Sequence, residues 1–168
     1  MRMFVPVAAF LAVLAWAGEG QAEQVTLQID NVQSDDEGWA ITRALARLPD
    51  VKVAQRVTKE KPTAIVAFDP AKADVGDLAR AVAQTGTTRR DKFAATLVLS
   101  YKRLDTKAAA DEAFLPGLVE PAFAKLRGVE VKGSKVDTKA KEIRITLDGK
   151  GGAKLADIKA AFPGLALE

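Results

Sequence analysis

The first half of the chain alternates between strand-like and helix-like spacing of its apolar residues. Residues 24–30 alternate polar and apolar side chains, with Val25, Leu27 and Ile29 apolar, which predicts a half-buried strand. A polar loop follows at 31–37. Apolar residues then recur at helical spacing over 41–48, which predicts one apolar helix face ended by the Pro-Asp pair that follows.

The same alternation continues through the next forty or so positions. Val51 begins a second predicted strand that runs toward Val57, and residues 64–68 alternate as a third. A second helix is predicted over 75–82, with Gly86 beyond its end. The order is β-α-β-β-α, and we expect a short fourth strand over 87–90.

The pattern then repeats, which indicates an internal duplication. Residues 93–101 form the strongest strand-like segment, and residues 122–131 match residues 44–53 apolar for apolar. Later segments match the third strand and second helix of the first half, and a final strand is expected at 165–167. We therefore predict an α+β protein made of two ferredoxin-like βαββαβ units in tandem. The pattern leaves open whether strand 93–101 ends the first unit or begins the second.

The amino terminus has the pattern of a secretory signal peptide. A basic start is followed by an apolar run over 4–17, with small residues near its end. We assign 1–22 to the signal peptide, 23–91 to the first unit and 92–168 to the second. The protein is then exported, either periplasmic or secreted, with no stable membrane span after cleavage.

Composition narrows the function further. The chain has no Cys and no His, and both Met residues lie in the predicted signal peptide. It therefore lacks the usual nucleophile and general base for neutral-pH catalysis, so we expect no enzyme activity and no cofactor. A formal net charge of +3 is too small to indicate nucleic-acid binding.

One family matches the residues of the first unit. The segment 44–51 reads Ala-Leu-Ala-Arg-Leu-Pro-Asp-Val, and 66–70 reads Val-Ala-Phe-Asp-Pro. With the loop at 31–37, these segments resemble the heavy-metal-associated (HMA) domain family of copper, zinc and mercury carriers. The resemblance implies a ferredoxin-like fold with its metal loop between the first strand and the first helix. In the second unit the resemblance runs from Ala122 to Phe162, without a recognisable metal loop.

The chain departs from that family where the family binds metal. Ser34 and Glu37 occupy the positions of the two metal-binding cysteines of the family. Soft thiolates select heavy metals, and the mature chain has no Cys, His or Met to replace them. We therefore predict an interaction protein that binds another protein and has lost its heavy-metal site.

An alternative keeps a metal role in altered form. The loop carries Ser34, Asp35, Asp36 and Glu37, with Asp30 just before it, and carboxylate oxygens suit hard cations such as Ca²⁺ or Mg²⁺. The same residues are also typical of a helix N-terminus, where a Ser or Asp side chain caps exposed N–H groups.

Three further features allow more than one interpretation. The segment 148–154, Asp-Gly-Lys-Gly-Gly-Ala-Lys, is either a phosphate-binding loop or a turn before the last helix, and it lacks the P-loop spacing. The run 89–92 is either an anion contact or a solvated linker. Trp39 is either a partner contact or a core aromatic. We also expect Leu45 and Leu126 to be corresponding core positions of the two units.

Overall fold

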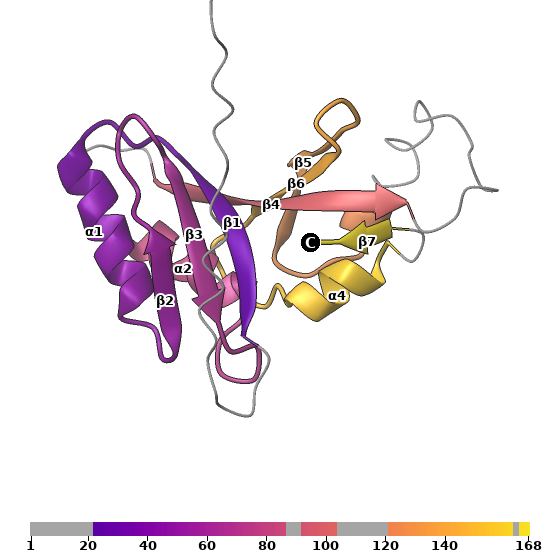
Figure 1. Cartoon of the computed structure of the whole chain (residues 1–168), viewed down its shortest axis with the longest axis horizontal. Coiled ribbons are helices and arrows are strands. Elements are labelled where there is room, and N and C mark those ends of the chain that lie inside the picture. The colour runs from indigo at the N-terminus through magenta and orange to yellow at the C-terminus, as the bar shows by residue number, and fades with distance from the viewer. Residues whose placement is uncertain (1–21, 87–91, 104–120, 163–164) are drawn as a thin grey trace, which may run out of the picture.

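The computed structural model describes residues 22–86, 92–103, 121–162 and 165–168 (Figure 1). The predicted signal peptide up to residue 21, the strand expected over 87–90 and the basic run over 89–91 lie outside these residues. No helix among the described residues is long and apolar enough to cross a membrane.

The first half is built from four strands and two helices. In chain order these are β1 (Glu23–Asp30), α1 (Asp35–Ala46), β2 (Val51–Gln55), β3 (Thr63–Phe68), α2 (Val75–Gln84) and β4 (Ala94–Arg103). The strands lie in the order β2-β3-β1-β4, and each pairs antiparallel with its neighbour. This order is that of a ferredoxin-like βαββαβ unit.

The second half begins with the same strand, β4. A helical turn at 121–123 precedes β5 (Val129–Asp137), β6 (Glu142–Leu147), α4 (Leu155–Ala160) and β7 (Leu165–Leu167). Its strands lie in the order β5-β6-β4-β7, again antiparallel. The second half therefore has the strand order of the first, and the predicted α+β class with ferredoxin-like sheet order is confirmed.

The shared strand β4 answers the question that the sequence left open. One edge of β4 pairs with β6, over 95–100. The other edge pairs with β1 over 94–98 and then with β7 over 101–103, as Figure 1 shows along the length of the β4 arrow. The strand therefore both ends the first half and begins the second, and the described strands form one seven-stranded sheet. The predicted boundary between 91 and 92 falls just before this shared strand.

One face of the sheet carries the core of both halves. The register places Leu97 of β4 beside Leu27 of β1 and beside Ile145 of β6, and all three side chains are fully buried. The buried residues of α1, α2 and α4 join them in a single apolar cluster. Alternate residues on β1, β4 and β6 project to the opposite face, which the described helices leave uncovered.

The two halves also share local turn geometry. Asp50 and Gly128 each have positive φ, 54° and 71°, directly before β2 and β5. Asp69 accepts a hydrogen bond from the backbone N–H two residues on, and Asp148 does the same after β6. These correspondences extend the predicted repeat from apolar spacing to backbone conformation.

One predicted core position is wrong. Leu45 is fully buried, as expected, but Leu126 is only partly buried and lies beyond the helical turn. Phe123 is buried instead, and its ring packs edge-on against Phe162 with 5.6 Å between ring centroids. Leu126 packs against the core only in part, as Leu48 does in the first half. In the match of 122–131 to 44–53, Phe123 corresponds to Leu45 and Leu126 to Leu48.

Candidate functional site

The loop between β1 and α1 is the position of the predicted metal site. It leaves β1 at Asp30, which is exposed, and turns at Asn31, which has φ of 69°. The Asn31 side-chain amide donates to the Lys92 carbonyl at 3.0 Å. This bond ties the loop to the backbone that leads into β4.

Ser34 and Glu37, which the resemblance places at the family's cysteine positions, bind backbone N–H groups at the N-terminus of α1. The Ser34 Oγ accepts a hydrogen bond from the Glu37 backbone N–H at 3.3 Å, and Ser34 has the extended backbone of an N-cap residue. The Glu37 carboxylate turns back and accepts from the Gln33 backbone N–H at 2.7 Å. Both side chains thus satisfy backbone donors at the start of the helix. Glu37 binds the residue before the N-cap, one position earlier than in a capping box.

The other two predicted ligands point elsewhere. The Asp35 carboxylate accepts from the Lys59 backbone N–H at 2.9 Å, which links the loop to the β2–β3 connection. Asp36 is exposed on the first turn of α1. Among the described residues, no three or more His, Cys, Asp or Glu side chains gather as a metal-binding group. The structure therefore places the four residues at a helix start, where the Asp35 and Glu37 carboxylates bind separate backbone N–H groups and Asp36 is exposed.

A shallow depression lies beside this loop, with a volume of about 440 Å³. Asp35, Asp36, Trp39, Arg56 and the backbone near Thr58 line it. Trp39 is 57% exposed, and the Arg43 guanidinium carbon lies 3.3 Å from its ring centroid. Of the two interpretations of Trp39, the structure excludes the core aromatic. The Arg43 guanidinium stacks on this exposed ring in a cation–π contact.

The glycine-rich segment 148–154 packs against helix α2. The Gly76 N–H donates to the Ala153 carbonyl at 2.9 Å. A Cβ on Gly76 would lie 2.6 Å from the Gly152 nitrogen, and one on Gly149 would lie 2.7 Å from the Ala83 Cβ. The segment is therefore a close joint between the two halves, and its backbone faces a helix where a phosphate loop would face a ligand.

A second depression, of about 400 Å³, lies between the halves. Its lining comes from the start of β1, the end of β3, the segment 70–74 and the start of α4. Two of its charged groups form ion pairs: Glu23 with Lys159 at 3.3 Å, and Lys72 with Asp50 at 2.8 Å. Sequence reasoning missed this site, because only tertiary packing brings the two halves together.

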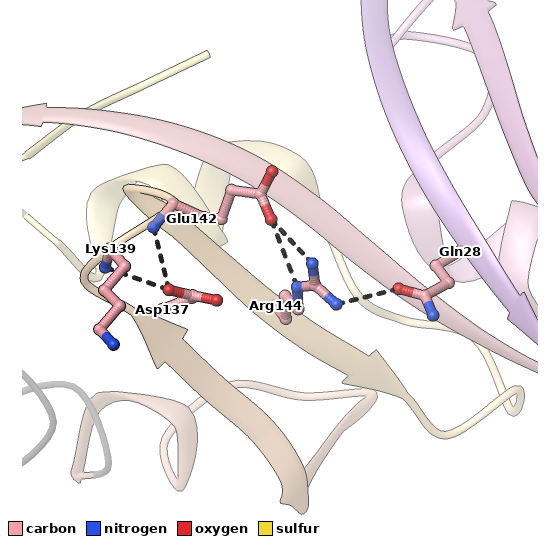
Figure 2. A network of polar contacts seen from close by, with 6 residues as sticks. Gln28, Asp137, Lys139, Glu142 and Arg144 are labelled. Atoms are coloured by element: carbon pink, nitrogen blue, oxygen red, sulfur yellow. Dashed lines mark hydrogen bonds and ion pairs between the residues drawn. The ribbon is translucent and has the colours of Figure 1, made fainter.

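A polar network crosses the uncovered face of the sheet (Figure 2). Arg144 of β6 donates to the Glu142 carboxylate at 3.0 Å and to the Gln28 side-chain oxygen of β1 at 3.2 Å. It therefore spans β4 and joins the two halves. At the end of β5, the Asp137 carboxylate accepts backbone N–H groups of Ala140 and Lys139. The Ala140 bond is the main cause of the lowered pKa of Asp137.

These features define the class of protein. The chain is an α+β protein with two ferredoxin-like halves on one sheet, and its described residues carry a helix cap in the loop between β1 and α1. No family model and no curated protein matches the chain.

Two solved structures are similar to it, both at 17% identity over 89% of this chain. One is the water soluble region of the P-type ATPase CopA from Bacillus subtilis, with 91% of that chain covered and a TM-score of 0.39. The other is the solution structure of the N-terminal soluble domains of Bacillus subtilis CopA, with 94% covered and a TM-score of 0.40. The strand order described above, and not this similarity, defines the fold.

Proposed function

We propose that this chain is an exported, non-catalytic interaction protein, built from HMA-like units whose heavy-metal site has been lost. One observation carries the proposal. Ser34 and Glu37, which stand where the family has its metal-binding cysteines, are engaged by the backbone at the start of α1. A loop that binds its own helix end is a stable structural element and needs no ion.

The sheet supports a role in protein contact. The face opposite the helices carries residues such as Thr26, Val98 and Thr146, and Arg144 is held flat across it by Glu142 and Gln28. A preordered Arg on an open sheet face loses little entropy when a partner binds. Protein contact through this face or through the sheet edges is the function we propose.

Titration with metals tests the loss of the site. The exported chain would be titrated calorimetrically with Cu(I), Zn²⁺, Ca²⁺ and Mg²⁺ to about 1 mM, which covers the weak end of extracellular calcium sites. We expect no saturable heat. Stoichiometric copper binding would overturn the proposal. Calcium binding that disappears in the double variant Asp35→Ala, Glu37→Ala would favour the alternative of a hard-cation site.

Affinity capture tests the interaction. The immobilised chain would be incubated with the exported fraction of its own cells, and bound proteins would be identified by mass spectrometry. We expect a reproducible partner that is lost with Arg144→Glu and kept with Lys125→Glu, a matched change of an exposed Lys in the segment before β5. A chain that captures nothing reproducibly, at high or low salt, would contradict the proposal. Detection of the uncleaved chain in the cytoplasm alone would contradict export.

A further inference from the structure

The outer surface of helix α1 is exposed along its whole length. Asp35, Trp39, Arg43 and Arg47 recur every four residues, and each is exposed, so they form one ridge along the helix. Ile41 and Leu45 lie on the opposite side and are fully buried. In Figure 1, α1 forms one end of the long axis of the molecule, with no described element over its outer side. This ridge is called the α1 ridge below.

Charge changes sign along the α1 ridge. Its first turn is acidic, with Asp36 next to Asp35, and its last turn and cap are basic, with Arg43 and Arg47. Trp39 lies between them, 57% exposed and stacked under the Arg43 guanidinium. A uniformly acidic or basic partner would match only one end of such a ridge. An anionic membrane surface would be repelled by the two Asp residues directly beside the Trp ring.

A second copy of the same ridge matches both ends. When two α1 helices pack antiparallel about a twofold axis near position 41, Asp35 lies opposite Arg47 of the second copy, and Trp39 lies opposite its Arg43. Asp36 then lies within one turn of both basic residues of the other helix. The two helix dipoles also run antiparallel, so that each acidic N-terminus faces a basic C-terminus.

We propose that the chain self-associates through the α1 ridge as an antiparallel, twofold-symmetric helix pair. This specifies a partner for the interaction function proposed above and rests on it. Trp and Arg are the residues that most often dominate binding energy at interfaces, and the Trp39–Arg43 stack is already ordered before contact. Because one pair of short helices makes a small interface, the association is weak and reversible.

The test is sedimentation velocity on the exported chain, from about 10 µM to about 1 mM, a range that spans weak affinities. We expect the sedimentation coefficient to rise with concentration and the rise to shrink as salt is added. Trp39→Ala should remove it. Lys125→Asp, an exposed charge change in the segment before β5, should leave it unchanged.

Charge-reversal variants test the proposed antiparallel register of the two α1 helices. Asp36 and Arg47 have no hydrogen bond or ion pair from their side chains to other described residues, so changing either leaves the local structure intact. Asp36→Arg and Arg47→Asp should each weaken self-association at least about tenfold, because each places like charges together. An equimolar mixture of the two variants should associate more strongly than either variant alone. The mixed pair keeps one end with its native charges, whereas each variant paired with itself has like charges at both ends.

The outcomes are distinct. A chain that stays monomeric up to about 1 mM overturns the self-association, as does association that persists in both single variants or a mixture that fails to recover. Should a variant unfold, which circular dichroism would show, the dilution dependence of Trp39 fluorescence in the unmodified chain gives the same answer. A monomeric chain that still captures another exported protein would leave the proposed interaction function intact.

Discussion

Truncating Leu97 should destabilise both halves of the protein together. Leu97 lies at the centre of β4, is fully buried and has Leu27 on one side and Ile145 on the other. Leu27 belongs to the first half and Ile145 to the second. Leu97→Ala therefore opens a cavity in the part of the core where the two halves meet.

The expected loss follows from the removed atoms. Three buried carbons at about 0.8 kcal/mol each give about 2.4 kcal/mol of lost transfer free energy. The unfilled cavity adds to this, for a total of about 3–4 kcal/mol. With a urea dependence of about 2 kcal/mol per molar, the unfolding midpoint should fall by about 1.5–2 M.

Two native chromophores report on the two halves. Trp39 lies on α1, and Tyr101, the single tyrosine of the chain, lies where β4 pairs with β7. Urea unfolding followed by Trp39 fluorescence and by near-ultraviolet circular dichroism of Tyr101 should show coincident transitions before and after the substitution. Val98→Ala, on the uncovered face of the same strand, is the control and should cost only about 1 kcal/mol.

Different unfolding midpoints for the two chromophores would contradict the coupling of the two halves through β4. If Leu97→Ala lowers the midpoint seen by one chromophore and leaves the other in place, the halves unfold independently and β4 does not couple them. A loss below about 1 kcal/mol by both probes would show that the position is not buried as described.

Three other predictions concern local contacts. Gly76→Ala should destabilise the chain by about 1–3 kcal/mol in urea unfolding, because the added Cβ would press on the backbone of the glycine-rich segment 148–154. The control, Gly86→Ala, has open space around it and should leave the stability unchanged. Equal effects of the two substitutions would contradict the close packing of this segment on α2. Asp74→Ala removes the capping box of α2 and should cost about 1 kcal/mol in the same assay, and an unchanged midpoint would mean that the cap contributes nothing. The pKa of Asp137 is lowered in the folded state. Its carboxylate therefore stabilises the folded chain at pH values above its unfolded pKa of about 3.9. This stabilisation is lost as the pH falls through the lower, folded-state pKa. Titration of Asp137 by NMR should give a pKa below that of a model peptide, and an ordinary value would show that the Ala140 and Lys139 bonds do not form in solution.

Much of the local structure was accessible from the sequence. Alternation in β1, β3 and β6 predicted which residues face the core, because a side chain on a strand has only two directions to choose from. The sequence offered Ser34 or Asp35 as the N-cap of the first helix, and the structure assigns the cap to Ser34. The failed position, Leu126, was paired with the wrong residue of the first half. The match of 122–131 to 44–53 aligns Phe123 with Leu45, and both are buried, whereas Leu126 aligns with Leu48, and both are partly buried.

The candidate site was predictable only in part. The sequence allowed either a hard-cation site or a helix start for residues 34–37, and these residues begin α1. The carboxylate partners, such as the Lys59 backbone 24 positions away from Asp35, depend on how loops meet in space. The exposure of Trp39 was left open for the same reason. An aromatic residue near the start of a helix faces solvent or core according to the element that packs beside it.

The sequence by itself determined most of the strands and helices, the repeat of apolar spacing and the absence of thiol and imidazole ligands, since these depend on residue type and spacing alone. Only the tertiary structure decided that β4 belongs to both halves and that the glycine-rich segment packs on α2. The physical reason is that side-chain alternation specifies the buried face of a strand, whereas pairing uses backbone groups that are the same at both edges of every strand. Which strand occupies each edge is therefore settled by the packing of the whole chain.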